Sequence, residues 1–426
     1  CPECLRIVPA EVYAENGKVL MHKTCPVHGA FKSLLWSDQR SYSGLFKYET
    51  PGSPPNPTFH SQQGCPYNCG LCREHKQHTC LAILEVTGRC NLTCPVCIAN
   101  PSRVKPEPEL NHIEDTLKKL LKSEGAPTAL QISGGEPTLR KDLPEIVGLA
   151  KSLGFKRIEI DTNGVELARN KTLAENLAAS GAGGIYLQFD SITEEANICL
   201  RGKAQLFSLK EKAIRAALRA GLEVVLAATI VKGVNDDQVW DIIRYAVKRK
   251  LRGVNFQTFA ASGRYPPILF NPMNRITIPQ ILREIQVQSG GVLKVADFIP
   301  IPCPDVRCSV LAYTIIAEDG RLISLSRLVD AEKIIGLHRM PGDYSHVLEA
   351  LAQIRGSCFR LLPDSFDENF FSVSCHSLQD VWTVDLKRVK RCCIHELTID
   401  GRLVPFCLYH LTSVNGEPFY KHIVRA

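Results

Sequence analysis

The chain has 426 residues, a net charge of +7 and a hydrophobic content of 45%, with a mean hydropathy near zero. These values fit a globular protein of about two or three domains and exclude a disordered chain. The basic residues are scattered apart from short runs such as residues 248–252, so we expect no nucleic-acid partner. No apolar run reaches the roughly 18 to 20 residues that a membrane-spanning helix needs.

The chain contains 18 cysteines, most of them in closely spaced groups. Such spacing is typical of metal or cluster ligands, whereas disulfide frameworks belong to short secreted chains. We therefore expect a protein of the reducing cytoplasm that binds several metal centres.

The first 50 residues are expected to form a small metal-binding module. Cys1 and Cys4 precede a predicted hairpin turn at residues 15–17, and Cys25 lies in a turn with His28. Three sulfur atoms and a fourth ligand can hold a tetrahedral zinc ion or a rubredoxin-like iron ion. His28 is the nearest candidate for the fourth ligand, and a histidine that only caps the turn is the alternative.

Residues 51–80 are predicted to form a linker and an auxiliary cluster segment. The linker, residues 51–57, is rich in proline, glycine and serine. It leads to Cys65, Cys69 and Cys72, which are followed closely by Cys80 in GCPYNCGLCREHKQHTC. Because a 4Fe-4S cluster normally takes four thiolates, these four cysteines predict a closed auxiliary cluster.

Residues 81–299 alternate between predicted strands and predicted helices. Short apolar runs predict strands at 81–86, 129–133, 157–161, 184–190, 224–230 and 254–259. Helical periodicity predicts helices between them, for example at 113–121, 143–153 and 240–247. Six such units in series imply an α/β fold with a parallel sheet, either open or curled into a partial barrel. In either arrangement the ligand is expected at the carboxyl ends of the strands.

A second copy of the cysteine spacing, Cys90, Cys94 and Cys97, directly follows the first of these strands. No further cysteine follows until Cys199, so a cluster here keeps one iron open to a substrate or cofactor. A closed zinc or storage cluster is the alternative, but it requires a nearby fourth ligand. The chain reads GGEP at 134–137, after the second strand, where glycines let backbone amides approach a ligand closely.

Residues 300–426 are predicted to form an α+β lobe. Hairpin turns are expected at Asp319 and Gly320 and at Asp400 and Gly401. The cysteines that can supply a second auxiliary cluster in this lobe are Cys303, Cys308, Cys407 and either Cys392 or Cys393.

The open cysteine triad and the GGEP turn together resemble the signature of the radical S-adenosylmethionine superfamily. The resemblance implies a partial (β/α)6 barrel and a 4Fe-4S cluster, held by the catalytic cysteines of the triad, whose open iron binds S-adenosylmethionine. An electron from a donor such as ferredoxin or flavodoxin then cleaves this cofactor to methionine and a 5'-deoxyadenosyl radical. The cofactor contacts that the resemblance implies are Gly134, Gly135, Glu136, Pro137, Thr162, Asn163, Gln188, Asp190, Lys232 and Asn235. Asp190 could equally cap the next helix.

A narrower resemblance covers nearly the whole chain. The ordered motifs CPEC, TCPVHG, GCPYNCGLCREHKQHTC, GRCNLTCPVC, ISGGEP, FQTFAASGR and CCIHELTIDGRLVPFC resemble the archaeal tetraether lipid synthase group of radical S-adenosylmethionine enzymes, earlier discussed as pterin methylases. The resemblance implies three 4Fe-4S clusters and one mononuclear iron, or zinc in its place. It also implies that terminal methyl carbons of isoprenoid chains of archaeal diether lipids are joined, with transient peripheral contact to a membrane surface.

Two other functions are open at this point. The first is radical methylation of a pterin or a similar heterocycle, which needs compact polar walls, whereas lipid coupling needs a long apolar channel. The second is a metal-rich electron-transfer or zinc-ribbon binding protein without catalysis, against which the GGEP turn argues.

Overall fold

The N-terminal part of the chain is a small antiparallel sheet. The computed structural model describes residues 1–54, 56, 64–67, 69–101, 107–301, 303–337, 369–398 and 400–420. The small sheet consists of β1 (Ala10–Glu15), β2 (Lys18–Cys25) and β3 (Gly29–Trp36), and α1 (Gln39–Leu45) follows it. Asn16 and Gly17 connect β1 to β2 with positive φ angles of 50° and 73°, which a tight hairpin turn requires. The predicted hairpin is therefore confirmed.

Six parallel strands in chain order form the centre of the large sheet. They are β4 (Leu81–Glu85), β5 (Ala129–Ser133), β6 (Ile158–Thr162), β7 (Gly184–Gln188), β8 (Glu223–Ile230) and β9 (Gly253–Thr258). All six predicted strands are present, with ends shifted by at most about two residues, as is usual for element boundaries. The predicted α/β fold with a parallel sheet is confirmed.

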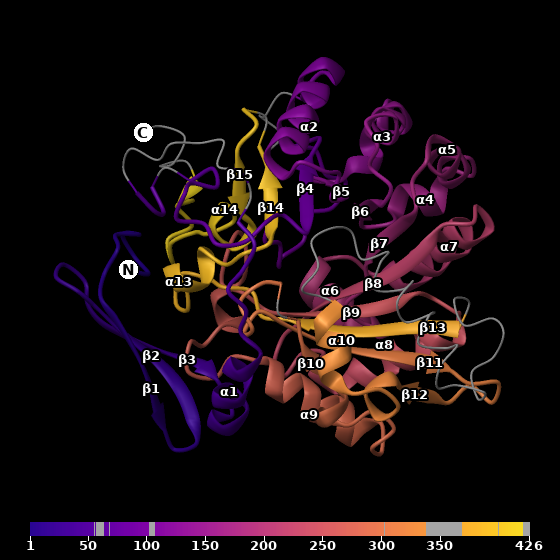
Figure 1. The fold of residues 1–426 in the computed structure, drawn as a ribbon. Helices are drawn as coiled ribbons and strands as arrows, with labels where there is room; N and C mark the ends of the chain where they lie inside the picture. Colours follow the sequence, from indigo (N-terminus) through magenta and orange to yellow (C-terminus); the bar gives the residue numbers. More distant parts are fainter. Residues whose placement is uncertain are drawn as a thin grey trace.

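Helices connect these strands and lie along the outer side of the curved sheet (Figure 1). They are α2 (Leu110–Glu124), α3 (Leu143–Ser152), α4 (Val165–Arg169), α5 (Leu173–Ser180), α6 (Glu194–Arg201), α7 (Leu206–Arg219) and α8 (Val239–Lys248). Within the described residues, no helix has both the length and the apolar character that crossing a membrane requires.

Strands from the C-terminal part of the chain extend this sheet at both edges. β13 (Phe370–His376) pairs in parallel with β9, and β14 (Ile394–Leu397) pairs in parallel with β4. The strands beyond them are β10 (Ile299–Pro300), β11 (Ser309–Ile316) and β12 (Leu322–Ser324) on one side and β15 (Leu403–Pro405) on the other. The helices of this part are α9 (Ile278–Gln288), α10 (Ala331–Leu337), α13 (Leu386–Val389) and α14 (Phe406–Tyr409).

The C-terminal strands also explain two predicted turns. β11 pairs with β12, and β14 pairs with β15, each in an antiparallel hairpin around a predicted Asp-Gly turn. The chain division at residues 50, 80 and 299 remains a prediction. The strands after residue 300 nevertheless belong to the same sheet as the barrel strands.

Side chains alternate between the two faces of the parallel strands, as the pleat requires. On β5, Leu130 and Ile132 are fully buried in the hydrophobic core that includes the helices. Gln131 and Ser133, at the intervening positions, line a cavity inside the curved sheet. The outer face of the sheet therefore stabilises the fold, while the inner face is available for function.

Candidate active site

A cavity of about 470 Å³ lies on the inner face of the sheet. This volume is within the range of about 300 to 1,000 Å³ that small-molecule sites occupy. Its lining includes Cys90 and Glu136 beyond the carboxyl ends of the strands, and Leu81 and Phe370 at the amino ends of β4 and β13. The cavity therefore extends along the length of the parallel strands.

The loop after β4 carries the open cysteine triad, and Cys90, Cys94 and Cys97 all line the cavity. Two contacts with Arg264 hold this loop: Arg264 Nε donates to the Cys94 carbonyl at 2.8 Å, and the Cys97 N–H donates to the Arg264 carbonyl at 2.8 Å. Gly263 permits this approach, because its φ is +68° and a Cβ atom there would lie 2.4 Å from the Cys97 carbonyl oxygen. The structure thus brings the three predicted catalytic cysteines together.

Burial favours the neutral thiols of Cys90 and Cys97. It raises the pKa of Cys90 to about 11 and also raises the pKa of Cys97. A positively charged metal centre is what would stabilise thiolates in such surroundings, since metal ligation requires the deprotonated sulfur. The three half-buried thiols around one cavity therefore fit a cluster site.

The GGEP turn packs directly against the loop after β4. A Cβ atom on Gly134 would lie 2.5 Å from the Thr87 carbonyl oxygen, and one on Gly135 would lie 2.3 Å from the Arg89 carbonyl oxygen. Both positions therefore require glycine. The contact brings the backbone of the turn next to the segment that leads into Cys90.

Glu136 connects the GGEP turn to the loop after β6. Its buried carboxylate accepts hydrogen bonds from Thr162 Oγ1 at 2.6 Å and from the Asn163 N–H at 2.7 Å. Burial raises the pKa of Glu136. The Asn163 side chain in turn donates to Asn91 Oδ1 at 2.8 Å and lies 4.0 Å from Cys90 Sγ. Two predicted cofactor contacts are thereby fixed beside the triad.

The predicted cofactor contacts divide into two groups. Those that line the cavity are Gly134, Gly135, Glu136, Thr162, Asn163 and Gln188. Pro137, Asp190, Lys232 and Asn235 do not line it. The Lys232 ammonium binds Asn274 Oδ1 at 2.5 Å, and Asn235 holds its own loop by accepting from the Val231 N–H and donating to the Asp190 carbonyl.

Asp190 also differs from both of its predicted roles. Its buried carboxylate pairs with Arg201, which donates from Nε at 2.5 Å and from Nη2 at 2.8 Å. Sequence reasoning missed Arg201 and Lys210, two buried cations that contact predicted cofactor residues. Lys210 Nζ donates to Gln188 Oε1 at 2.7 Å and to the Asn163 carbonyl at 2.5 Å, and burial lowers the pKa of this lysine to about 8. Lys210 lies in the charged stretch LKEK, which reads as a solvated helix face.

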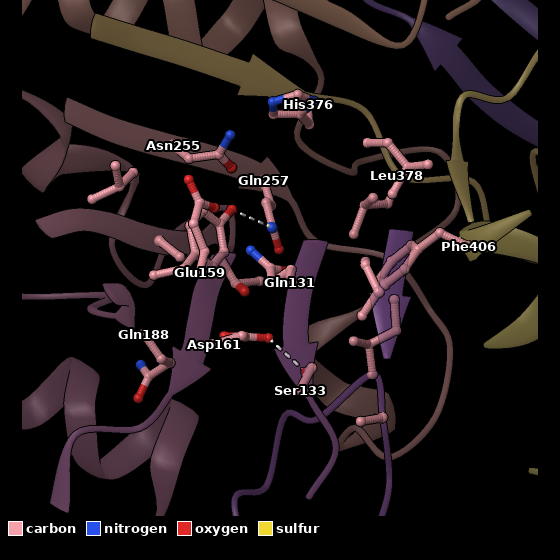
Figure 2. Close-up of a pocket in the computed structure, with 18 of the residues that line it drawn as sticks. Gln131, Ser133, Glu159, Asp161, Gln188, Asn255, Gln257, His376, Leu378 and Phe406 are labelled. Atoms are coloured by element: carbon pink, nitrogen blue, oxygen red, sulfur yellow. Dashed lines mark hydrogen bonds between the residues drawn. The ribbon is translucent and has the colours of Figure 1, made fainter. Parts of the chain in front are cut away.

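Polar side chains cover much of the inner face of β5 to β9, and we call this surface the polar wall (Figure 2). Its residues are Gln131, Ser133, Glu159, Asp161, Tyr186, Gln188, Asn255 and Gln257. Ser133 Oγ donates to Asp161 Oδ2 at 2.9 Å, and Gln257 Nε2 donates to the Tyr186 hydroxyl at 3.0 Å. A period-two reading of the strands could have found these positions, because each directly follows a core residue.

Two residues of the polar wall are unusual for a buried surface. Burial, together with the nearby carboxylates of Glu136 and Glu159, raises the pKa of Asp161 to about 7. Asn255 donates to Ser374 Oγ at 2.8 Å, but its buried Oδ1 atom has no hydrogen-bond partner among the described residues. Unsatisfied buried polar atoms are rare in native proteins, so Asn255 Oδ1 marks a position where a bound molecule could donate.

The cavity also has an apolar part, which lies beside the residues that begin β4 and β13. Leu81, Ile301, Leu311 and Phe370 line it. Cys80 lies here as well and forms a disulfide with Cys303. The structure therefore groups Cys80 with Cys303 and with His78, which differs from the predicted grouping of Cys80 with the first cysteine spacing.

The first cysteine spacing forms a separate small site. Cys65, Cys69 and Cys72 line a minor pocket together with His75. Burial raises the pKa of Cys65 to about 11 and that of Cys69 to about 12. These three thiols fit a metal centre, but the fourth ligand that the sequence predicted for them is engaged elsewhere.

Four cysteines of the C-terminal part form another group. The cysteines that lie close enough to Cys392 to interact with it electrostatically are Cys308, Cys393 and Cys407. Arg388 Nε donates to Cys308 Sγ at 3.2 Å, and the Gln379 N–H donates to Cys407 Sγ at 3.3 Å. Cys303, which was predicted to join them, is instead bonded to Cys80.

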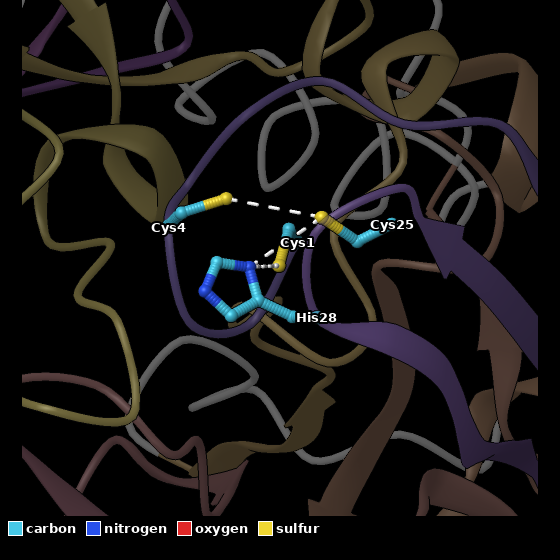
Figure 3. Close-up of side chains that lie close together, drawn as sticks. All are labelled: Cys1, Cys4, Cys25 and His28. Atoms are coloured by element: carbon cyan, nitrogen blue, oxygen red, sulfur yellow. Dashed lines mark hydrogen bonds between the residues drawn. The ribbon is translucent and has the colours of Figure 1, made fainter.

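The predicted N-terminal metal ligands converge on one point (Figure 3). His28 Nδ1 lies 3.5 Å from Cys25 Sγ and 3.7 Å from Cys1 Sγ, and Cys4 Sγ lies 4.0 Å from Cys25 Sγ. Hydrogen bonding from the Val27 N–H lowers the pKa of Cys25 to about 7. The donor set of three thiolates and one imidazole fits a tetrahedral zinc or iron ion.

Comparison with known proteins assigns these sites to a family. Residues 84–246 match the Radical SAM superfamily, and residues 1–37 match the HMPTM N-terminal zinc ribbon domain. The chain is 34% identical to the 7,8-dihydro-6-hydroxymethylpterin dimethyltransferase of Methanocaldococcus jannaschii, over 96% of this chain and 92% of that protein. It is 32% identical to a probable GTP 3',8-cyclase of Methanothermobacter marburgensis, over 38% of this chain and 52% of that protein.

Solved structures give a weaker match. The Streptococcus suis SuiB structure with bound S-adenosylmethionine has a TM-score of 0.42 and 16% identity, over 50% of this chain and 48% of that chain.

The comparison with the M. jannaschii enzyme contradicts one prediction, because that relative is named for methylation of a pterin. The predicted coupling of isoprenoid chains, the diether lipid substrate and the associated membrane partner are therefore not retained. The matched residues, the cysteine triad and the GGEP turn show that the chain belongs to the radical SAM superfamily.

Proposed function

We propose that the protein is a radical S-adenosylmethionine methylase that attaches methyl groups, taken from a one-carbon donor, to a pterin. The relative from M. jannaschii supports this proposal because it aligns over 96% of this chain at 34% identity. Pterin methylation was the alternative that the sequence left open, and it required a compact polar site.

The polar wall is the observation that carries the proposal. A pterin is a flat heterocycle whose edge presents both hydrogen-bond donors and hydrogen-bond acceptors. Gln131, Asn255 and Gln257 offer amide groups of both kinds, while Glu159 and Asp161 offer carboxylate acceptors. Asn255 Oδ1 is buried and has no partner in the described part of the chain, so a donor from the substrate would satisfy it. The cavity volume of about 470 Å³ suits one such small molecule.

The residues near the triad would hold the family's cofactors. When bound, a 4Fe-4S cluster and S-adenosylmethionine supply a 5'-deoxyadenosyl radical. The three thiols of the triad surround one end of the cavity, and Gly134 and Gly135 keep the neighbouring backbone free of side chains. Glu136 fixes the loop of Asn163 beside Cys90. These contacts would orient the cofactor toward the polar wall.

We propose the remaining metal sites from the ligand atoms that their residues bring together. Cys1, Cys4, Cys25 and His28 would hold one zinc or iron ion, since their ligand atoms all lie within 4.8 Å of one another. The thiols of Cys65, Cys69 and Cys72 and the C-terminal group would hold auxiliary clusters. The C-terminal group comprises Cys308, Cys392, Cys393 and Cys407. A reduced ferredoxin or flavodoxin would supply electrons.

Pterin binding tests this proposal. Fluorescence titration of 6-hydroxymethyl-7,8-dihydropterin under anaerobic conditions should show saturable binding to the reconstituted protein. Asn255→Leu should weaken this binding about tenfold, because one buried hydrogen bond contributes about 1 to 1.5 kcal/mol. Asn176→Leu on the exposed face of α5 is the matched control and should bind normally. Absence of binding to the wild-type protein would reject the proposed substrate.

A further inference from the structure

Three ionisable side chains from separate segments converge on the part of the cavity wall formed by β4, β14 and α14. Glu85 is the last residue of β4, Glu396 lies on β14, and His410 directly follows α14. All three side chains line the cavity. One ligand atom from each lies within 4.8 Å of the ligand atoms of the other two.

Strand pairing creates this convergence. β14 pairs in parallel with β4, and Glu396 is opposite Ile83. Glu85 follows two residues later and therefore points to the same inner face as Glu396. His410 lies at the end of α14, and its Nε2 atom is 2.9 Å from Glu396 Oε1. Glu396 and His410 are buried, with 2% and 8% exposed, whereas Glu85 is half-buried.

Neighbouring side chains hold two members of the group in place. The Tyr409 hydroxyl donates to Glu85 Oε2 at 2.7 Å. The imidazole ring of His410 packs against the rings of Phe406 and Tyr409, with centroid separations of 4.6 Å and 4.9 Å. Contacts of this kind orient the ligands of metal sites in proteins.

The loop after β9 carries a second observation that points to a ligand in the cavity. Gly263 donates its N–H to Thr412 Oγ1 at 3.0 Å, which joins the loop after β9 to the segment that follows His410. Ser262 precedes Gly263, lines the cavity and is 2% exposed. Its hydroxyl has no hydrogen-bond partner among the residues that the structure describes. A buried hydroxyl without a protein partner is expected to form a hydrogen bond with a bound molecule.

We propose that Glu85, Glu396 and His410 bind a divalent cation that prefers oxygen and nitrogen ligands, such as Mn²⁺ or Fe²⁺. Carboxylate and imidazole donors suit these ions, whereas thiolates select softer metals. Three protein ligands beside a cavity leave further coordination positions for a bound molecule, as in catalytic metal sites. The cation would polarise a carbonyl or hydroxyl oxygen of that molecule. This site is independent of the iron-sulfur centres and of the pterin assignment.

Titration with Mn²⁺ tests the proposal. The free ion has a strong electron paramagnetic resonance signal that decreases on binding, and the oxidised clusters of the reconstituted, zinc-loaded protein do not obscure it. The wild-type protein should bind about one Mn²⁺ per chain at the proposed three-ligand site. Glu396→Gln and His410→Gln should abolish this binding, and Tyr409→Phe should weaken it about tenfold.

The controls separate loss of the site from loss of the fold. Glu159→Gln replaces another carboxylate of the same cavity and should leave Mn²⁺ binding unchanged. The iron content and the visible absorption of each variant should match those of the wild-type protein. Absence of Mn²⁺ binding in the wild-type protein would overturn the proposal, and so would equal binding by Glu396→Gln. Pterin binding is measured separately, so either result can be distinguished from failure of the proposed function.

Discussion

Arg201 donates a hydrogen bond from Nη1 to the main-chain carbonyl oxygen of Val96 at 2.7 Å. Val96 directly precedes Cys97, and the same guanidinium pairs with the buried carboxylate of Asp190 after β7. The loop that carries the cysteine triad is therefore fixed to the centre of the sheet by Arg201, in addition to its contacts with Arg264.

Arg201→Lys should impair the triad without removing it. Lysine keeps the positive charge but cannot bind the Asp190 carboxylate and the Val96 carbonyl with one planar group. We expect near-normal iron content and a rate of 5'-deoxyadenosine formation at least about tenfold lower, which corresponds to about 1.4 kcal/mol in the barrier. Arg244→Lys on the exposed face of α8 is the control. An unchanged rate in Arg201→Lys would show that the arginine does not position the loop.

The two copies of the cysteine spacing should differ in their effect on cofactor cleavage. Cys94→Ala removes one thiol of the triad that lines the cavity, so it should abolish 5'-deoxyadenosine formation. Cys69→Ala changes the separate minor pocket and should leave that cleavage measurable while stopping product formation. Both quantities can be measured by chromatography after anaerobic reconstitution. The reverse pattern would exchange the roles of the two sites.

His28 should be a ligand of the N-terminal ion. His28→Ala should lower the bound zinc or iron by about one ion per chain, since structural sites of this kind use four ligands. His28→Cys supplies a thiolate instead and should retain the ion. His22→Ala on β2 is the control. Metal analysis gives the zinc and iron content of the wild-type protein and the three variants. Full metal content in His28→Ala would show that His28 only caps the turn.

Asp161 should make the stability depend on pH. Its pKa is raised to about 7 in the folded protein, so the folded state retains a proton that the unfolded state loses near pH 4. The free energy of unfolding should therefore fall as the pH rises from about 4 to 7, by an amount on the order of 4 kcal/mol, and level off above pH 7.

Asp161→Asn removes this dependence. The free energy of unfolding of the variant, measured by thermal unfolding, should change less between pH 5 and 7 than that of the wild-type protein. The difference should be about the share of the Asp161 contribution that is lost in this pH interval. Asp115→Asn on the exposed face of α2 should behave as the wild-type protein does. Parallel pH profiles for the wild-type protein and Asp161→Asn would contradict a raised pKa at this position.

The local sequence pattern was sufficient to predict the barrel strands and to single out the cysteine triad. The run LQIS before the GGEP turn alternates between core and cavity positions, so both the strand and the inward direction of Gln131 can be derived from it. The contacts made by β13 and β14 could not be derived in this way. Each pairs with a strand far away in the chain, and no local periodicity encodes which edge a strand joins.

Distant pairing also explains why the structure places Cys80 in a different group from the one that the sequence predicts. Cys80 follows the first spacing by only a few residues, yet it is bonded to Cys303, which lies 223 residues away. The sequence interval between cysteines predicts neighbours only while they share one loop, as Cys90, Cys94 and Cys97 do. The convergence of Glu85, Glu396 and His410 has the same origin, because it depends on the pairing of β14 with β4.

The most direct test of the proposed function measures two products in one reaction. The reconstituted and reduced protein is incubated with S-adenosylmethionine, 6-hydroxymethyl-7,8-dihydropterin and a one-carbon donor, and both 5'-deoxyadenosine and methylated pterin are quantified by mass spectrometry. We predict that both products accumulate together and that Cys94→Ala forms neither. Formation of 5'-deoxyadenosine without any methylated pterin would contradict the proposed function.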